Sequence, residues 1–323
     1  MLQVLVVIPT EDRHRTLLQR SAPDAQFTFT TISQVTRQQA QSADIILGNV
    51  PASMIAGSEK LKWLQLNSAG TDGYTARGIL PEGSVLTNAS GAYGLAISEH
   101  MLGALLCIMK KLDKYSANQR DHVWQDEGQV TSIYGSKTLI VGFGNLGSEF
   151  AVRMHALGSS VTGIRRSQSE KPAYLSALYQ MDALQDCLKE ADIVASFLPN
   201  TPQTRYLFNE DTFSMMKPGA YFLNAGRGNA VDSDALAHAL NSGHLAGAAI
   251  DVTDPEPLPA DHPLWDARNL LITPHISGQY HLKETHERII SIAAKNLEAF
   301  VNGKPLCNIV DFSTGYRIPK SSV

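Results

Sequence analysis

The sequence predicts an α/β protein built from two doubly wound parallel sheets, and three observations support this prediction. Short apolar runs alternate with helical patterns along most of the chain, which is typical of parallel strands covered by helices on both faces. One glycine-rich turn stands between an apolar run and a helical pattern near the middle of the chain. The length of 323 residues suits two domains of ordinary size.

The first part of the chain is predicted to be a series of strands and helices. Its apolar start lacks a basic leader and a small-residue cleavage site, so we interpret it as a buried strand and not as a signal peptide. A long, mostly apolar helix is expected at 95–115, followed by a loop at 121–136. A helix is also expected at 11–20, and strands at 4–8, 26–31, 44–48, 63–67 and 85–88.

The second part begins with the glycine-rich turn and repeats the same alternation. After the strand that leads into the turn, further buried strands are predicted at 161–164, 192–197, 220–224, 247–251 and 270–273. The last helix is expected at 287–301, and the tail after residue 303 has an extended and mostly polar pattern.

The glycine-rich turn reads Leu139-Ile140-Val141-Gly142-Phe143-Gly144-Asn145-Leu146-Gly147, a G-x-G-x-x-G motif in a strand–turn–helix context. Gly142 permits the tight turn, Gly144 lets the backbone approach a pyrophosphate, and Gly147 lets helix and strand pack closely. The alternative is an ordinary glycine turn. The context favours a dinucleotide site formed by Gly142, Phe143, Gly144, Asn145, Leu146 and Gly147.

Composition restricts the remaining possibilities. The net charge of −4 provides no basic surface, so nucleic acid is not an expected partner. Cys107, Cys187 and Cys307 are far apart and form no C-x-x-C, which indicates neither a disulfide framework nor a zinc site. We therefore expect no metal and a reducing, cytoplasmic location. The apolar stretch at 101–109 is too short to span a bilayer, so no membrane is expected.

Three motifs follow the glycine turn in order: Asn224-Ala225-Gly226-Arg227-Gly228, Asp254-Pro255-Glu256-Pro257-Leu258 and Thr273-Pro274-His275-Ile276-Ser277-Gly278. Together the motifs resemble the D-isomer-specific 2-hydroxyacid dehydrogenase family, and the resemblance covers nearly the whole chain. It implies a Rossmann cofactor domain at 99–286. It also implies a flavodoxin-like substrate-binding domain made of 1–98 and 287–323, with the active site in the cleft between the two.

The resemblance implies three catalytic residues. Arg227 would grip the carboxylate of a 2-keto acid and polarise its carbonyl, although an exposed loop arginine is the simpler reading. His275 would be the general acid/base, although most single histidines are structural or merely exposed. Glu256 would orient His275, although an acidic residue between prolines is by default a solvated charge. Glutamate rather than glutamine here disfavours the formate and phosphite branches.

The resemblance also assigns binding positions. The turn at Ser68, Ala69 and Gly70 would bind the substrate carboxylate through backbone N–H groups, against the alternative of an ordinary glycine turn. Asp251 would hold the nicotinamide carboxamide, and Met101 would either face the substrate or lie in the core. Further residues along the cofactor channel would be Leu198, Pro199, Thr204, Asn224, Ala225, Gly226, His275 and Gly278.

One position departs from the pattern of NAD-binding members. They carry an acidic residue about 18–20 residues after the last glycine, where it binds the ribose 2′-OH. Here that residue, 18 places after Gly147, is Arg165, and Arg166 and Ser167 follow it. Two guanidinium groups and a hydroxyl suit a 2′-phosphate, so NADP (as NADPH) is expected, with weaker use of NAD. The alternative is two exposed arginines and an unselective site.

The expected activity is the NADPH-dependent reduction of a small 2-keto acid to the D-2-hydroxy acid. The Arg165-Arg166-Ser167 cluster resembles the glyoxylate/hydroxypyruvate reductase branch, and a larger keto acid of phenylpyruvate or branched-chain type is the second choice. A long-type phosphoglycerate dehydrogenase is disfavoured because no regulatory domain follows residue 323. A nucleotide-sensing binding protein of the same fold is the alternative from another class. The family also implies a homodimer.

Overall fold

The computed structural model describes residues 1–318, and residue contacts divide the chain into two units. Unit 1 consists of Met1–Tyr93 and the chain from Leu282 onward, and unit 2 consists of Gly94–His281. The boundaries expected from the sequence, after residues 98 and 286, lie a few residues further along the chain.

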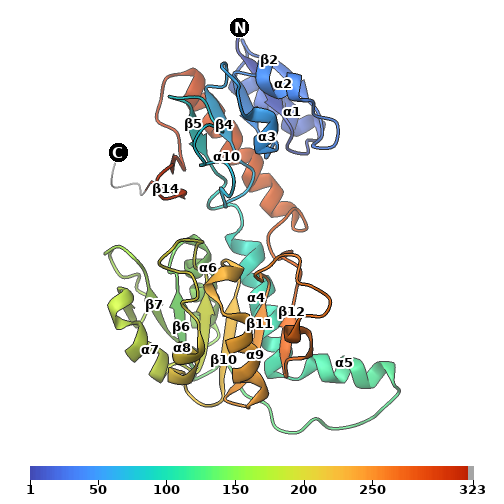
Figure 1. Cartoon of the computed structure of the whole chain (residues 1–323), viewed down its shortest axis with the longest axis vertical. Helices are drawn as coiled ribbons and strands as arrows, with labels where there is room; N and C mark the ends of the chain where they lie inside the picture. The colour runs from blue at the N-terminus through green and yellow to red at the C-terminus, as the bar shows by residue number, and fades with distance from the viewer. Residues whose placement is uncertain (319–323) are drawn as a thin grey trace. The chain divides into compact units, whose positions relative to one another are not determined.

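Unit 1 contains a five-stranded sheet in its described residues, with the order β2-β1-β3-β4-β5 and parallel pairing throughout (Figure 1). This is the flavodoxin-like order, which reverses between β1 and β3. The strands are β1 (Gln3–Val6), β2 (Gln26–Phe29), β3 (Ile45–Leu47), β4 (Trp63–Gln65) and β5 (Val85–Thr87). The helices are α1 (Asp12–Ser21), α2 (Arg37–Ser42), α3 (Ala52–Ile55) and α10 (Lys283–Val301).

Apolar residues at helical spacing attach α10 to the core of unit 1. The helix buries one stripe, which consists of Ile289, Ile290, Ala293, Ala294 and Leu297. Near its end Phe300 stacks on Trp63 of β4, with 5.3 Å between ring centroids. The C-terminal part of the chain therefore shares a hydrophobic core with the first strands.

Unit 2 contains a seven-stranded parallel sheet in the order β12-β11-β10-β9-β6-β7-β8. The order reverses between β6 and β9, as in a Rossmann fold, so the predicted fold class is confirmed. The strands are β6 (Lys137–Val141), β7 (Ser160–Ile164), β8 (Ala177–Tyr179), β9 (Ile193–Ser196), β10 (Ala220–Asn224), β11 (Leu245–Ile250) and β12 (Leu270–Ile272).

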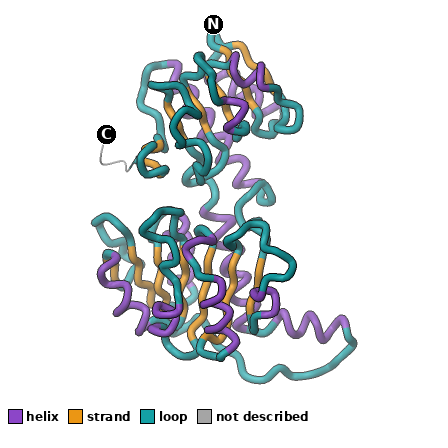
Figure 2. The backbone as a smooth tube through the Cα atoms, in the orientation of Figure 1, coloured by secondary structure: helices purple, strands orange, loops and turns teal. Residues whose placement is uncertain are grey.

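Helices flank this sheet, as Figure 2 shows in purple beside the orange strands of unit 2. They are α4 (Gly94–Met109), α6 (Asn145–Ala156), α7 (Leu184–Glu190), α8 (Glu210–Met215) and α9 (Ser233–Asn241), whereas α5 (Leu112–Arg120) buries no residue. Short 3-10 turns lie at Met181–Ala183, Gly228–Ala230 and Pro263–Asp266. Within residues 1–318, no helix combines the length and apolarity needed to cross a membrane.

The structure corrects several predicted elements. The helix expected at 95–115 ends at Met109, and α5 restarts at Leu112 because Lys111 takes a left-handed conformation with φ 57°. Strand β8 was not predicted, because its apolar run of Ala177, Leu178 and Tyr179 is only three residues long. Helix α10 starts before residue 287. The polar tail forms a small antiparallel hairpin of β13 (Val310–Asp311) and β14 (Tyr316–Arg317).

Candidate functional site

The predicted dinucleotide turn lies at the carboxyl end of β6, and its three glycines meet different constraints. Gly142 has φ 96°, and a Cβ there would lie 2.7 Å from the carbonyl oxygen of Phe197. A Cβ on Gly147 would lie 2.6 Å from the Gly142 carbonyl oxygen, so only glycine lets α6 approach the turn this closely. A Cβ on Gly144 would meet nothing within 4 Å, which leaves that backbone open to a ligand.

Orphaned polar atoms border the same turn. Helix α6 begins at Asn145, whose Oδ1 is buried and has no partner among the described residues. Ser196 ends β9 opposite Val141 of β6, is 0% exposed, and its Oγ also has no partner in residues 1–318. Buried polar atoms are nearly always hydrogen-bonded, and these two lie where the strand order reverses. The residues present therefore fit a dinucleotide with its pyrophosphate at the α6 N-terminus.

Arg165 follows β7 directly and is hydrogen-bonded to the loop that comes after it. One guanidinium nitrogen donates to Ser169 Oγ, and the other lies 3.4 Å from Ser167 Oγ. Arg166 and Ser167 are exposed. Residues 165–169 include no carboxylate, so the loop places cationic and hydroxyl groups together at the end of the second strand of this fold.

The loops after β9 and β10 pack backbone against backbone. A Cβ on Gly226 would lie 2.4 Å from the carbonyl oxygen of Leu198, so glycine is required for this approach. Asn224 Oδ1 accepts the Gly226 N–H at 3.1 Å and fixes the turn in which Ala225 lies. Thr204 Oγ1 donates to the carbonyl of Pro199 at 2.6 Å, so it closes its own loop. These predicted cofactor residues therefore lie in the loops at the carboxyl ends of β9 and β10.

Arg227 leaves β10 in an extended conformation and begins a 3-10 turn. Its carbonyl accepts the Asn224 side-chain amide at 3.1 Å, and its Nη1 donates to the Gly226 carbonyl at 3.0 Å. The next residue, Gly228, packs directly on the β11 loop, where a Cβ would lie 1.8 Å from the carbonyl oxygen of Thr253. The backbone that carries Arg227 is thus fixed against the loop that carries Glu256.

Glu256 and His275 come from the loops after adjacent strands β11 and β12 and form a pair. His275 Nδ1 lies 2.8 Å from Glu256 Oε2, and the side chains are 50% and 38% exposed respectively. The other carboxylate oxygen, Oε1, accepts the Thr253 N–H at 2.9 Å. An ionised carboxylate can only accept, so Nδ1 carries a proton and Nε2 is the ring nitrogen directed away from the pair.

Asp251 follows β11 and is 1% exposed. Its Oδ1 accepts the Thr273 hydroxyl at 2.6 Å and the Ile276 N–H at 3.0 Å. Its Oδ2 accepts both the N–H, at 3.1 Å, and the hydroxyl of Ser277. The family resemblance assigns this carboxylate to the nicotinamide, and within the protein its two oxygens accept these four hydrogen bonds.

The predicted carboxylate-binding turn lies in unit 1, after β4. The carbonyls of Ser68 and Ala69 accept hydrogen bonds from Ala89 N (2.9 Å) and Asn88 Nδ2 (2.8 Å), and Ser68 Oγ donates to the Gly70 carbonyl at 2.6 Å. The N–H groups of Ala69 and Gly70 donate to no acceptor within residues 1–318. The carbonyls of this turn are therefore hydrogen-bonded within the protein, while two of its N–H groups have no acceptor among residues 1–318.

A neighbouring loop of unit 1 is bonded to this turn. Asn49 N donates to Asn67 Oδ1 at 2.7 Å, and Asn67 N donates to Asn49 Oδ1 at 2.9 Å. Tyr74 donates to the Val50 carbonyl at 3.0 Å, and burial raises the pKa of Tyr74 to about 12, so it remains a neutral donor. These contacts link the loop after β3 to the turn after β4.

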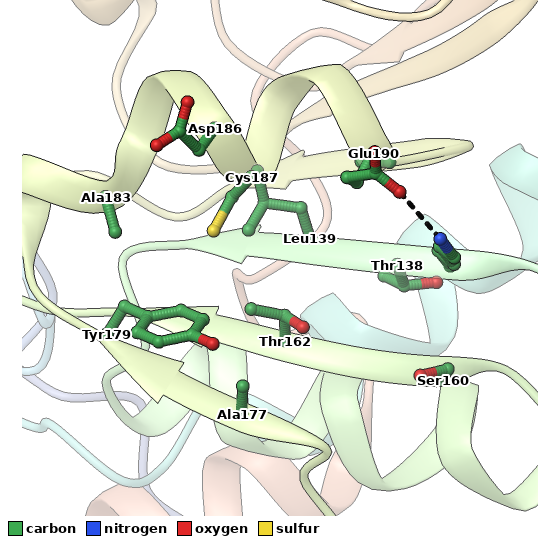
Figure 3. Close-up of a pocket in the computed structure, with 12 residues that line it drawn as sticks. Thr138, Leu139, Ser160, Thr162, Ala177, Tyr179, Ala183, Asp186, Cys187 and Glu190 are labelled. Carbon is green, nitrogen blue, oxygen red and sulfur yellow. Dashed lines mark hydrogen bonds and ion pairs between the residues drawn. The ribbon is translucent and has the colours of Figure 1, made fainter.

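A groove of about 510 Å³ in unit 2 is lined by none of the site residues described above (Figure 3). It is lined by the first halves of β6 and β7, by β8 and by α7, and the Lys137–Glu190 ion pair of 2.7 Å closes one end. Ligands of parallel α/β sheets bind at the carboxyl ends of the strands, so this groove is not the dinucleotide site.

The structure adds residues that the sequence motifs did not single out. Thr253 holds Glu256, while Thr273 and Ser277 hold Asp251. Ser277 lies inside a quoted motif, but its hydrogen bond to a carboxylate 26 residues earlier has no sequence signature. Met101, which had two interpretations, is 1% exposed and belongs to the core.

Comparison with known proteins identifies the family to which the chain is similar. Residues 102–277 match the NAD-binding domain of D-isomer specific 2-hydroxyacid dehydrogenases. An uncharacterized protein of the proB 3′ region of Corynebacterium melassecola is 32% identical over 290 residues, which cover 86% of this chain and 92% of that protein. The chain spans about half the length of the D-3-phosphoglycerate dehydrogenases that it also matches, such as that of Mycobacterium leprae.

Two crystal structures are similar over nearly the full length. A D-isomer specific 2-hydroxyacid dehydrogenase family protein from Aeromonas salmonicida is 33% identical with a TM-score of 0.86, and the match covers 96% of this chain and 99% of that one. A D-isomer specific 2-hydroxyacid dehydrogenase from Xanthobacter autotrophicus, in complex with NADPH and MES, is 26% identical with a TM-score of 0.80, and covers 98% and 99%.

Proposed function

Because the chain belongs to the D-isomer-specific 2-hydroxyacid dehydrogenase family, whose members are NAD(P)-dependent dehydrogenases, we propose that it reduces a small 2-keto acid to the D-2-hydroxy acid with NADPH. In this proposal unit 2 binds the cofactor and unit 1 contributes to substrate binding. The nicotinamide, when bound, supplies the hydride, and the residues of the chain bind the acid and move the proton.

The observation that carries the proposal is the 2.8 Å contact between His275 Nδ1 and Glu256 Oε2. The carboxylate stabilises the imidazolium and fixes the ring, so the proton for transfer lies on Nε2. In the reducing direction His275 Nε2 gives this proton to the substrate oxygen. In the oxidising direction the neutral ring takes the proton from the hydroxyl. The exposure of half of the His275 side chain leaves this nitrogen accessible to substrate.

Carboxylate binding is assigned to Arg227 and to the turn at Ser68–Gly70. A guanidinium matches a carboxylate in charge and geometry, and its positive charge also stabilises the alkoxide that develops as the carbonyl is reduced. The N–H groups of Ala69 and Gly70 add two neutral donors. The carbonyl groups of the same turn already accept hydrogen bonds from the protein. Replacing Arg227 by Lys keeps the charge but loses the fork, and KM for the keto acid is expected to rise by about tenfold or more.

The NADPH preference rests on Arg165, with Arg166 and Ser167 beside it. A carboxylate at this position would repel a 2′-phosphate, whereas a guanidinium attracts it. The related Xanthobacter protein was crystallised with NADPH, which supports the same choice here. The test is kcat/KM for NADPH and NADH with one keto acid. A preference for NADPH is expected, and a preference for NADH would contradict the assignment.

Glyoxylate and hydroxypyruvate are the first substrates proposed, on the basis of the Arg165-Arg166-Ser167 cluster. Phenylpyruvate and branched-chain 2-keto acids are the alternatives. Steady-state oxidation of NADPH with all of them, at equal concentrations, ranks the classes. A higher kcat/KM is expected for glyoxylate and hydroxypyruvate. A higher kcat/KM for phenylpyruvate or the branched-chain acids would contradict this choice and favour the larger substrates.

We also propose a cytoplasmic homodimer. The three cysteines are free thiols, which suits a reducing compartment.

The dimer is supported by an exposed apolar segment. Helix α5 buries no residue, and Figure 1 shows it leading away from the sheet of unit 2. The segment that follows exposes Trp124 completely, and Leu112, Val123 and Val130 are about half-exposed. Light scattering is expected to give a dimer for the wild type and a monomer fraction for Trp124→Glu. A monomeric wild type would contradict the dimer.

A further inference from the structure

The turn at 68–70, which the proposed function assigns to the substrate carboxylate, is attached to the chain segment that follows α10. We propose that Asn308 and Thr71 are positioning residues for the substrate, because they hold this turn against the segment 307–315. The proposal rests on the proposed function, since it gives the segment a role in binding the keto acid. All of the residues concerned belong to unit 1.

The first argument is the way in which the turn is bonded. Each carbonyl of residues 67–70 accepts a hydrogen bond, and the donors are, in order, the Tyr93 hydroxyl, the Ala89 N–H, the Asn88 side-chain amide and the Ser68 hydroxyl. The N–H groups of Ala69 and Gly70 share peptide planes with the second and third of these carbonyls, so they point the opposite way. Asn88 and Ala89 therefore set the direction of both N–H groups.

The second argument is that Asn308 holds Asn88. The Asn88 N–H donates to the Asn308 carbonyl at 3.2 Å. The Asn308 side-chain amide donates to the carbonyls of Asn88, at 3.2 Å, and Ser90, at 2.8 Å. With φ 58°, Asn308 is left-handed, a conformation that asparagine adopts more readily than most residues with a side chain. Three hydrogen bonds thus fix the backbone that carries the Asn88 amide to the turn.

A second attachment lies at Thr71, directly after the turn. Thr71 is 7% exposed, and its hydroxyl donates to the Gly315 carbonyl at 2.6 Å, across 244 positions of the chain. Gly315 lies between β13 and β14 and has φ 71°, and a Cβ there would lie 3.4 Å from the Thr71 hydroxyl oxygen. The small hairpin therefore meets the turn through a backbone carbonyl.

The segment itself is fixed by buried polar groups. After α10 it returns to the end of β5, where Ile309 forms an antiparallel bridge with Thr87 (Figure 1). Asn296 of α10 is 1% exposed and pairs with the N–H and carbonyl of Cys307 at 2.7 and 3.0 Å. It also donates to Gln65 Oε1 at 2.8 Å, an oxygen that accepts the Thr87 hydroxyl as well. Satisfied buried networks are rigid, so the segment is a fixed support for the turn.

The test is Asn308→Gly, because glycine adopts the left-handed conformation freely and only the side-chain donors are lost. With NADPH and a small keto acid, KM for the acid is expected to rise by about fivefold, the effect of one neutral hydrogen bond. The value of kcat should change by less than about twofold, since ground-state and transition-state binding are lost together. Thr71→Val should raise KM in the same way, and Thr71→Ser should restore it because serine keeps the hydroxyl.

The matched control is Asn269→Gly. Asn269 is also left-handed, with φ 52°, and its side-chain amide donates to the Ala246 carbonyl at 2.9 Å. Its own carbonyl accepts the Ala248 N–H at 3.0 Å, as the Asn308 carbonyl accepts a backbone N–H. Asn269 belongs to unit 2, so the same chemical change there should leave KM for the keto acid unchanged.

Hydrogen exchange supplies a readout that is independent of activity. The Ala89 N–H binds the Ser68 carbonyl, so its exchange rate reports whether the turn stays in place. Exchange at Ala89 should be faster in Asn308→Gly and in Thr71→Val than in the wild type, and unchanged in Asn269→Gly.

The proposal is overturned if KM keeps its wild-type value in both Asn308→Gly and Thr71→Val, or if exchange at Ala89 is unchanged in both. An equal rise of KM in Asn269→Gly would also overturn it, because the effect would then be a general loss of stability. Failure of the proposed function has a different signature. In that case the wild type itself would oxidise no NADPH with any keto acid of the panel, while exchange at Ala89 would still decide whether the segment holds the turn.

Discussion

Replacing Glu256 by Gln removes the negative charge beside His275 but leaves the shape of the side chain. The contact is 2.8 Å long, and hydrogen bonds to charged groups contribute about 1.5–3 kcal/mol when buried. Here the two side chains are 50% and 38% exposed, which lowers the value toward that of surface pairs, at most about 1 kcal/mol. A loss of about 1 kcal/mol is therefore expected, which corresponds to roughly a fivefold lower kcat.

A second effect arises from Thr253, whose N–H donates to the other oxygen of Glu256 at 2.9 Å. A glutamine has one carbonyl oxygen, so either Thr253 or His275 then faces an NH₂ group. The assay is the keto-acid reduction rate between about pH 6 and pH 8, the range in which histidine changes charge.

The matched control is Glu210→Gln. Glu210 lies 3.7 Å from His238 in the same unit, and both side chains are at least 70% exposed. This substitution makes the same chemical change in a histidine–glutamate pair outside the site, and it should leave both kcat and the pH profile unchanged. Wild-type kcat and an unmoved pH profile for Glu256→Gln would refute the role of Glu256 in the proton relay.

Three further outcomes are expected. Arg165→Glu should lower kcat/KM for NADPH by about 10–100-fold, which is the effect of losing one charged hydrogen-bonding partner. An unchanged ratio of kcat/KM for NADPH to that for NADH would show that Arg165 does not bind the 2′-phosphate. Gly228→Ala forces a Cβ to 1.8 Å from the Thr253 carbonyl oxygen, so urea unfolding should show about 3 kcal/mol lower stability, and wild-type stability would contradict the packing. Burial alone would raise the pKa of Asp192, but hydrogen bonds from Lys217 and its neighbours hold it below its ordinary value. Its stabilisation is thus present above about pH 4 and is lost as the pH falls through the folded pKa, so Asp192→Asn should cost about 1 kcal/mol at neutral pH and progressively less as the pH falls below about 4.

Much of the fold follows from apolar runs that are buried on both faces of a sheet. Strands such as β6 and β9 contain buried apolar runs, at 139–141 and 193–195, which the sequence alone indicates. Strand β8 was missed because its apolar run is only three residues long. The break between α4 and α5 depends on the left-handed Lys111, and lysine is not a residue type that signals such a conformation.

The candidate site also contains some features that the sequence reveals and others that it does not. The glycine turn, Arg227, Glu256 and His275 are visible as ordered motifs, because their chemistry requires particular residue types at particular places. The surroundings of Asp251 could not be predicted, because its four donors come from residues 273–277, more than 20 positions later in the chain.

The most direct test is the rate of NADPH oxidation with glyoxylate or hydroxypyruvate for the wild type and for His275→Ala. The wild type is expected to oxidise NADPH and to form the D-2-hydroxy acid, and the variant to lose about 100-fold or more of kcat, as expected for removal of a general acid. A wild type inactive on every 2-keto acid, or a His275→Ala variant with the wild-type rate, would contradict the account.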